Sequence, residues 1–212
     1  MQEEIASIRT NYSQMSLDED SIDRDPIAQF QKWWKEAIDA KIDEPNAMTL
    51  ATASADGLPS ARIVLLKGFS REGFLFFSNY KSFKGKQLDE NPKACLVFFW
   101  KELERQVRIT GLVQKASVGA SDEYFHSRPT GSQVGATISP QSEVIESRKW
   151  LEDRYELAMA DKKETFNRPS HWGGYLVKPV VIEFWQGRPS RLHDRLQFDL
   201  FESEWKISRL AP

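Results

Sequence analysis

The stretch from residue 47 to residue 115 constrains the fold most, because turn signals divide it into short apolar segments. Asp56-Gly57 and Asn91-Pro92 are pairs that typically turn the chain or end an element. Residues 81–91 have helical composition, and the segments with strand composition are 47–53, 61–67, 74–78, 93–100 and 106–114. Closely spaced strands with one helical insertion favour a small antiparallel β-barrel over a doubly wound sheet.

The flanking sequence adds helices and further strands. Asp25-Pro26 predicts a helix start, and apolar residues at helical spacing follow, with Trp33 and Trp34 expected in the core. Helices are expected over 118–126 and 143–160 with a loop at 127–142, a break at 169–174, and strands over 180–186, 193–200 and 205–210. We therefore predict a mainly β protein with helices (α+β), with a flexible or ligand-dependent arm at 1–24 and a single domain at 25–212.

Composition excludes several classes of protein. The chain has 29 basic and 31 acidic residues, and this balance gives no reason to expect bulk nucleic-acid binding. Cys95 is the only cysteine, so no disulfide forms within the chain, and its apolar surroundings predict a buried, inert thiol. The polar start of the chain and the lack of a long apolar stretch predict a cytoplasmic protein without a membrane partner.

Common catalytic motifs are absent from the sequence. Neither a dinucleotide-binding glycine loop nor a Walker-type phosphate loop occurs. The sequence also lacks the HExxH zinc motif and a Gly-x-Ser-x-Gly elbow, and its three histidines lie far apart. No metal site is expected.

Three clusters of basic residues are candidates for anion binding. Arg62 and Lys67 fall on opposite faces of a strand by pleat alternation, either as solvated ends or as cations beside an anionic ligand. The segment 77–84 joins a strand to a helix N-terminus, where Ser82 is either a plain N-cap or part of a phosphate site. Arg191, His193 and Arg195 alternate and would share one strand face, where they would repel one another without an anion.

A further possible anion cradle consists of Tyr124, Arg128 and Ser132. Arginine suits such a role because its planar guanidinium binds phosphate with two parallel hydrogen bonds.

The order of these motifs resembles one known family. The motifs are Arg62–Lys67 (RIVLLK), Ser78-Asn79 with Ser82 and Lys84, Glu104–Val107, Tyr124–Pro129, Ser132-Gln133, Gln141-Ser142, Trp172–Gly174, Glu183–Gly187, Arg191–Arg195 and Trp205–Pro212. Together they resemble the pyridoxine/pyridoxamine 5′-phosphate oxidase family over nearly the whole chain. The resemblance implies an FMN-binding split β-barrel and a homodimer that holds each FMN between its subunits.

The resemblance also implies roles for individual residues. The FMN site would comprise Arg62, Ile63, Val64, Leu65, Leu66, Lys67, Phe77, Ser78, Ser82, Lys84, Gln106, Gln141, Ser142, Trp185 and Arg195. The substrate site would comprise Arg9, Tyr12, Lys67, Tyr124, Arg128, Ser132, Arg191 and His193, with Arg191 and His193 over the reacting ring as catalytic residues. Arg9 and Tyr12 match an N-terminal segment that closes over the site.

The implied reaction oxidises pyridoxine 5′-phosphate or pyridoxamine 5′-phosphate to pyridoxal 5′-phosphate by hydride transfer to FMN. Dioxygen is the implied electron acceptor and hydrogen peroxide the second product. A related split-barrel flavoprotein, such as a flavin reductase, and a non-catalytic protein that binds FMN or pyridoxal phosphate remain the alternatives.

One position departs from the family pattern. Phe83 stands where the family usually has an arginine that contacts the FMN phosphate. Loss of one charge-assisted hydrogen bond costs about 1.5–3 kcal/mol, or roughly ten- to a hundredfold in affinity. The sequence therefore predicts FMN binding that is weaker than is typical of the family.

Overall fold

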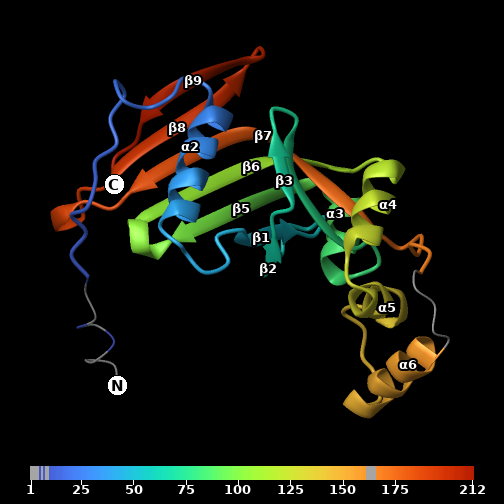
Figure 1. Ribbon diagram of the computed structural model, residues 1–212. Helices are drawn as coiled ribbons and strands as arrows, with labels where there is room; N and C mark the ends of the chain where they lie inside the picture. The colour runs from blue at the N-terminus through green and yellow to red at the C-terminus, as the bar shows by residue number, and fades with distance from the viewer. Residues whose placement is uncertain (1–4, 6, 8–9, 161–165) are drawn as a thin grey trace. The chain divides into compact units, whose positions relative to one another are not determined.

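The computed structural model describes residues 5, 7, 10–160 and 166–212 (Figure 1). They form two compact units. The first unit comprises the residues up to Thr49 together with 95–110 and 179–212, and the second comprises 50–94 and 111–178. The expectation of a single domain over 25–212 stays a prediction.

The described residues contain one sheet of nine strands. The strand order is β2-β1-β5-β6-β7-β4-β3, and β8 pairs with both β7 and β9. The strands are β1 (Ala47–Ala53), β2 (Pro59–Leu65), β3 (Gly68–Ser70), β4 (Gly73–Asn79), β5 (Lys93–Trp100), β6 (Arg105–Lys115), β7 (Trp172–Gln186), β8 (Asp194–Phe201) and β9 (Glu204–Arg209). The predicted strands are thus present, and most of their ends lie within two residues of the predicted ends.

The first unit packs its core around helix α2 (Pro26–Asp39). Asp25 caps this helix by accepting a hydrogen bond from Ile27 N, and Pro26 occupies the first turn, as predicted. Phe30 packs on Phe98 with ring centroids 5.3 Å apart, and Trp33 packs on Phe184 at 5.2 Å. Burial of these aromatic faces fixes the helix against β5 and β7.

The described part of the N-terminal arm also belongs to the first unit. Leu17 and Ile22 are buried, and Leu17 N donates to Asp194 Oδ2 at 3.1 Å. Arg209 binds the Glu19 carboxylate and the Leu17 carbonyl. Residues 17–22 are therefore anchored, while the flexibility of the whole arm stays a prediction.

The second unit pairs β4 with β7 in antiparallel register, from Phe74↔Val177 to Asn79↔Trp172. Its helices are α3 (Phe83–Glu90), α4 (Val118–Ser127), α5 (Thr130–Ile138) and α6 (Arg148–Ala160). Helices α5 and α6 lie side by side (Figure 1). The register of β4 with β7 brings the Ser78-Asn79 end of one strand beside Trp172 at the start of the other.

Three local predictions were wrong. The expected loop 127–142 contains helix α5, and the expected break at 169–174 includes the first residues of β7. Cys95 is half-buried rather than buried, because its neighbours Ala94 and Leu96 point to the other, buried face of β5.

None of the helices in the described part of the chain has the length and apolar character needed to span a membrane.

Candidate active site

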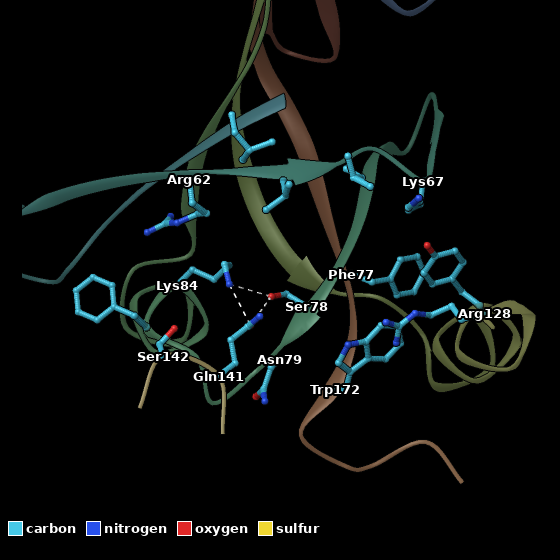
Figure 2. Close-up of a pocket in the computed structure, with 15 residues that line it drawn as sticks. Arg62, Lys67, Phe77, Ser78, Asn79, Lys84, Arg128, Gln141, Ser142 and Trp172 are labelled. Carbon is cyan, nitrogen blue, oxygen red and sulfur yellow. Dashed lines mark hydrogen bonds between the residues drawn. The ribbon is translucent and has the colours of Figure 1, made fainter. Parts of the chain in front are cut away.

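The second unit contains a cavity of about 740 Å³, which is within the usual range for small-molecule sites. Its walls come from β2, the end of β4, the start of α3, helix α4, residues 141–142 and the start of β7. The lining residues are Arg62, Ile63, Val64, Leu65, Lys67, Phe77, Ser78, Asn79, Phe83, Lys84, Tyr124, Arg128, Gln141, Ser142 and Trp172 (Figure 2). No acidic side chain occurs among these described lining residues, although four of them are cationic.

Lys84 is the most buried cation of this cavity, with 8% of its surface exposed. Its ammonium donates to Ser78 Oγ and to Gln141 Oε1, both at 3.1 Å (Figure 2). It also donates to Ser82 Oγ at 3.3 Å. All three acceptors are neutral. Burial, and then the nearby charge of Arg62, lower the pKa of Lys84 to about 8.

Ser82 has one of the two roles considered for it from the sequence, that of an N-cap, and its part in a phosphate site stays a prediction. It is the N-cap of α3, where its Oγ accepts from Gly85 N at 3.3 Å, and the same oxygen binds the Lys84 ammonium. The strand end before it is turned by Asn79, whose Oδ1 accepts from Lys81 N at 2.8 Å. This strand–turn–helix arrangement places a helix N-terminus and a lysine at one end of the cavity.

Arg62 is held on the same side of the cavity as Lys84 (Figure 2). Its guanidinium donates to Thr52 Oγ1 at 2.6 Å, to Ser60 Oγ and to the Leu50 carbonyl at 3.2 Å. Both hydroxyls in turn donate to Gln87 Oε1 at 2.6 Å. None of these partners carries charge, and burial lowers the pKa of Arg62.

The opposite side of the cavity carries Lys67 and Arg128 (Figure 2). Arg128 Nη1 is one of two buried side-chain polar atoms without a hydrogen-bond partner in the described part of the chain. Its guanidinium lies 4.7 Å from the Trp172 ring centroid, and burial lowers its pKa while Tyr124 opposes that shift. A buried donor without a partner is costly, and this N–H remains available to donate to a ligand group.

Three aromatic rings form a wall of the cavity. Phe77 stacks on Tyr124 with centroids 4.0 Å apart and on Trp172 at 5.5 Å. Lys67 Nζ lies 5.8 Å from the Tyr124 centroid. The stack gives the cavity a flat, apolar surface between its cationic sides.

A second group of candidate residues lies in the first unit, around His193. The Trp185 ring lies 4.6 Å from the His193 ring, and Tyr12 packs against both rings at 5.8 and 6.0 Å. His193 Nδ1 accepts a hydrogen bond from Arg188 N at 3.1 Å, so the neutral ring carries its proton on Nε2. Burial and the charge of Arg191 lower the pKa of His193, whereas Asp194 opposes them.

Arg195 has a carboxylate partner. It donates to both oxygens of Glu183, at 2.9 and 3.2 Å, and Glu183 is 3% exposed. Arg108 donates to the same carboxylate at 3.0 Å, and Gln106 is half-buried on the same strand, β6.

Two of the sequence-based orientations were wrong. Arg191, His193 and Arg195 do not share a strand face, because β8 begins at Asp194 and Arg191 lies in a 3₁₀ turn with φ of 62°. Arg62 and Lys67 do not point to opposite faces, because β2 ends at Leu65 and both residues line the cavity.

The cavity brings together most of the predicted residues of its unit, but not all of them. Leu66 and Ser82 are buried behind its lining, and Ser132 is exposed on the first turn of α5. Arg9 lies outside the described residues. Sequence reasoning assigned no role to Asn79 and Trp172, which also line the cavity, although both stood in the quoted motifs.

Two family models and several named relatives match this chain. Residues 34–158 match the family model described as pyridoxamine 5′-phosphate oxidase. Residues 172–212 match the family model of the pyridoxine 5′-phosphate oxidase C-terminal dimerisation region. The pyridoxine/pyridoxamine 5′-phosphate oxidase of Salinibacter ruber is 53% identical over 98% of this chain and 99% of its own length. The protein of the same name from Burkholderia mallei is 56% identical over 98% and 99%.

Solved structures agree with this result. PhzG from Burkholderia lata 383, in complex with tetrahydrophenazine-1-carboxylic acid, has a TM-score of 0.90 at 27% identity and covers 96% of this chain and 100% of its own. A pyridoxamine 5′-phosphate oxidase-related, FMN-binding protein from Nostoc punctiforme has a TM-score of 0.72 at 15% identity, over 93% and 100%. These likenesses confirm the predicted split-barrel fold, and the chain belongs to the pyridoxine/pyridoxamine 5′-phosphate oxidase family.

Proposed function

We propose that the protein oxidises pyridoxine 5′-phosphate and pyridoxamine 5′-phosphate to pyridoxal 5′-phosphate with FMN as cofactor, consuming dioxygen and releasing hydrogen peroxide. With pyridoxamine 5′-phosphate the reaction also consumes water and releases ammonia. The observation that carries this proposal is a cavity with uncompensated cations on two separate sides. Two anionic groups would satisfy it, one from a flavin phosphate and one from a phosphorylated substrate. The full-length relatives that carry this activity in their names support the same reading.

The residues on the Lys84 side fit the FMN phosphate. Lys84, Ser82 and Arg62 present an ammonium, a hydroxyl at a helix N-terminus and a guanidinium with neutral partners only. Gln141 and Ser142 belong to the same end, and residues 62–67 with Phe77 and Ser78 would line the flavin ring. FMN supplies the hydride acceptor of the reaction, and these residues orient it and neutralise its charge.

The residues on the Arg128 side fit the substrate phosphate. Arg128 Nη1 has no partner among the described residues, and Lys67 and Tyr124 lie beside it. A phosphate there would accept the free N–H of Arg128 and be held by two cations. Ser132 is part of this proposal through the family resemblance, and its exposed position would suit a contact made when substrate binds.

The residues of the first unit would complete the site in a homodimer, which the match to a dimerisation region supports. Gln106, Trp185 and Arg195 are proposed for FMN, and Arg9, Tyr12, Arg191 and His193 for substrate. The lowered pKa of His193 keeps its ring mostly neutral near pH 7, and Nε2 is then a hydrogen-bond donor. In this geometry His193 would orient a polar group of the substrate by donating to it, rather than remove a proton.

An anaerobic spectrum of the FMN-loaded protein tests the proposal. Addition of pyridoxine 5′-phosphate should bleach the flavin band, and admission of air should restore it with appearance of pyridoxal 5′-phosphate and hydrogen peroxide. Pyridoxamine 5′-phosphate should give the same result. A flavin that stays oxidised with both substrates would favour a split-barrel flavoprotein with another substrate or a non-catalytic binding protein.

A further inference from the structure

We propose that Glu104 is a positioning residue for the substrate site: its buried carboxylate holds the N-terminal arm so that the Tyr12 ring packs on Trp185 and His193. This inference rests on the proposed function and adds a residue to it. Every residue in the argument lies in the first unit.

The carboxylate of Glu104 receives two hydrogen bonds from the backbone of the arm. Ser13 N and Gln14 N donate to Oε2 at 2.8 and 3.1 Å, although they are about ninety positions away in sequence. Glu104 is only 6% exposed. Hydrogen bonds to an ionised acceptor are stronger than neutral ones, and burial protects them from competition by water.

The backbone of Glu104 is itself fixed to the strand that carries Trp185. Gly187 N donates to the Glu104 carbonyl at 2.7 Å, and Gln186 Nε2 donates to the same oxygen at 3.2 Å. Glu104 has a φ of 54°, in the left-handed region, and its N–H donates to the Lys101 carbonyl. The residue thus joins the arm directly to the end of β7.

Gly187 leaves the space that Tyr12 occupies. A Cβ at this position would lie 2.7 Å from both Cβ and Cγ of Tyr12 and 3.0 Å from Glu104 Cβ. The Tyr12 ring meets the Trp185 ring edge-on, at 89°, and the His193 ring at 60°. The bonds to Ser13 and Gln14 immediately follow Tyr12, so they determine where this ring lies.

The arm has separate anchors further along the chain. Leu17 and Ile22 are buried, Leu17 N donates to Asp194, and Arg209 binds Glu19. Loss of the Glu104 carboxylate should therefore release Tyr12 without detaching residues 17–22. This separation makes a positioning role distinguishable from a general role in folding.

The test compares Glu104→Ala and Glu104→Gln with Glu102→Ala, an exposed glutamate whose side chain makes no bond to the arm among the described contacts. Hydrogen exchange at residues 12–14 should accelerate at least about tenfold in Glu104→Ala, as expected when two charge-assisted bonds are lost. Glu104→Gln keeps an oxygen acceptor and should show a smaller change. Glu102→Ala should match the parent protein, and exchange at residues 17–22 should stay unchanged in all three variants.

The kinetic part measures KM for pyridoxine 5′-phosphate and the Kd of FMN. Glu104→Ala should raise KM about tenfold, leave FMN affinity unchanged and have no further effect when Tyr12 is already alanine. Equal losses in both backgrounds, or parallel loss of FMN affinity, would overturn the positioning role.

The exchange experiment needs no activity, so it separates the two proposals. Unchanged exchange at residues 12–14 overturns the role of Glu104 whether or not the protein oxidises this substrate. If Glu104→Ala does not fold, Glu104→Gln is compared with Glu102→Ala: faster exchange at residues 12–14 in Glu104→Gln supports the role, and equal exchange overturns it.

Discussion

The cations that line the cavity differ from the arginines of the first unit in what they bind. In the first unit, arginines have carboxylate partners: Arg195 binds Glu183, Arg105 binds Glu36, and Arg209 binds Glu19. In the cavity of the second unit, Lys84 and Arg62 have only neutral acceptors, and Arg128 Nη1 has none among the described residues. The paired cations stabilise the fold, whereas we propose that the cavity cations bind an anionic ligand.

The difference has an energetic basis. A buried cation without a counter-charge destabilises the folded protein, and the lowered pKa of Lys84 is the sign of that cost. The same arrangement favours ligand binding, because the hydroxyl and amide groups around Lys84 already hold it in place. The arrangement that lowers the stability of the ligand-free protein is thus the one that should favour binding of an anion.

The largest expected effect is on FMN affinity. Lys84→Met should weaken FMN binding about a hundredfold, since it removes a charge-assisted contact to phosphate worth up to about 3 kcal/mol. The matched control is Lys86→Met, which changes an exposed lysine on the same helix. Fluorescence titration measures both values. Equal losses in the two variants would mean that unpaired burial does not identify the phosphate site.

The second prediction compares the stability of Arg195→Met with that of Arg128→Met. Arg195→Met should lower the free energy of unfolding by about 1–3 kcal/mol, because the buried Glu183 carboxylate loses two of its hydrogen bonds. Arg128→Met should cost less than about 1 kcal/mol, since it removes an unsatisfied donor together with cation–π contacts to Trp172 and, at longer range, Phe125. Urea unfolding of the FMN-free proteins measures both, and similar costs would remove the distinction between the units.

The third prediction concerns pH. FMN affinity should be highest near pH 7 and fall as pH rises through the Lys84 pKa of about 8, because only the charged ammonium pairs with phosphate. Between pH 7 and 9 the loss should be about tenfold, and the ligand phosphate, with a second pKa of ~6, is a dianion throughout. The Kd of FMN is measured for the parent protein and for Lys84→Met between pH 7 and 9, and in the variant it should not change with pH. A parent protein with a flat profile would contradict the assignment.

The smallest expected effect comes from Phe83→Arg. Phe83 lines the cavity but is 53% exposed, so solvent would screen an arginine there. We expect FMN to bind about three- to tenfold more tightly, at or below the lower end of the range for one charge-assisted hydrogen bond. The Kd of FMN is compared between Phe83→Arg and the parent protein at low and at moderate salt, and the gain in affinity should become smaller as the salt concentration rises. Unchanged affinity would mean that the existing cations already satisfy the phosphate.

Local signals were enough to predict much of the fold and part of the site. The Asp25-Pro26 helix start and the β5 segment follow from capping and hydrophobic pattern, and the structure contains both. Ser82 could be predicted as an N-cap from its residue type and its place before a helical segment, and the same residue types occur in phosphate-binding turns. Such features depend on a few neighbouring residues, which the sequence displays directly.

Features that depend on distant contacts or unusual backbone could not be predicted. Gly131 and Gly135 lower the helix propensity of α5, and Gly173-Gly174 resembled a break although they lie within β7. A Cβ at Gly173 would lie 2.1 Å from the Tyr80 hydroxyl, so tertiary packing requires that glycine. The left-handed backbone of Arg191 and the bond between Lys84 and Gln141, 57 positions apart, have no signal in the sequence.

The hydroxyl network behind Arg62 has a consequence for how such a site changes over generations. Gln87 Oε1 accepts hydrogen bonds from both Thr52 and Ser60, which leaves the lone pairs of those oxygens facing the guanidinium. Gln87 does not line the cavity, so replacing its amide with a carboxylate would add a negative charge near Arg62 without changing a lining residue, at the loss of the bond from Gln87 Nε2 to the Leu58 carbonyl. Natural selection could therefore change the strength of anion binding through a substitution at Gln87, while the residues that line the cavity stay the same.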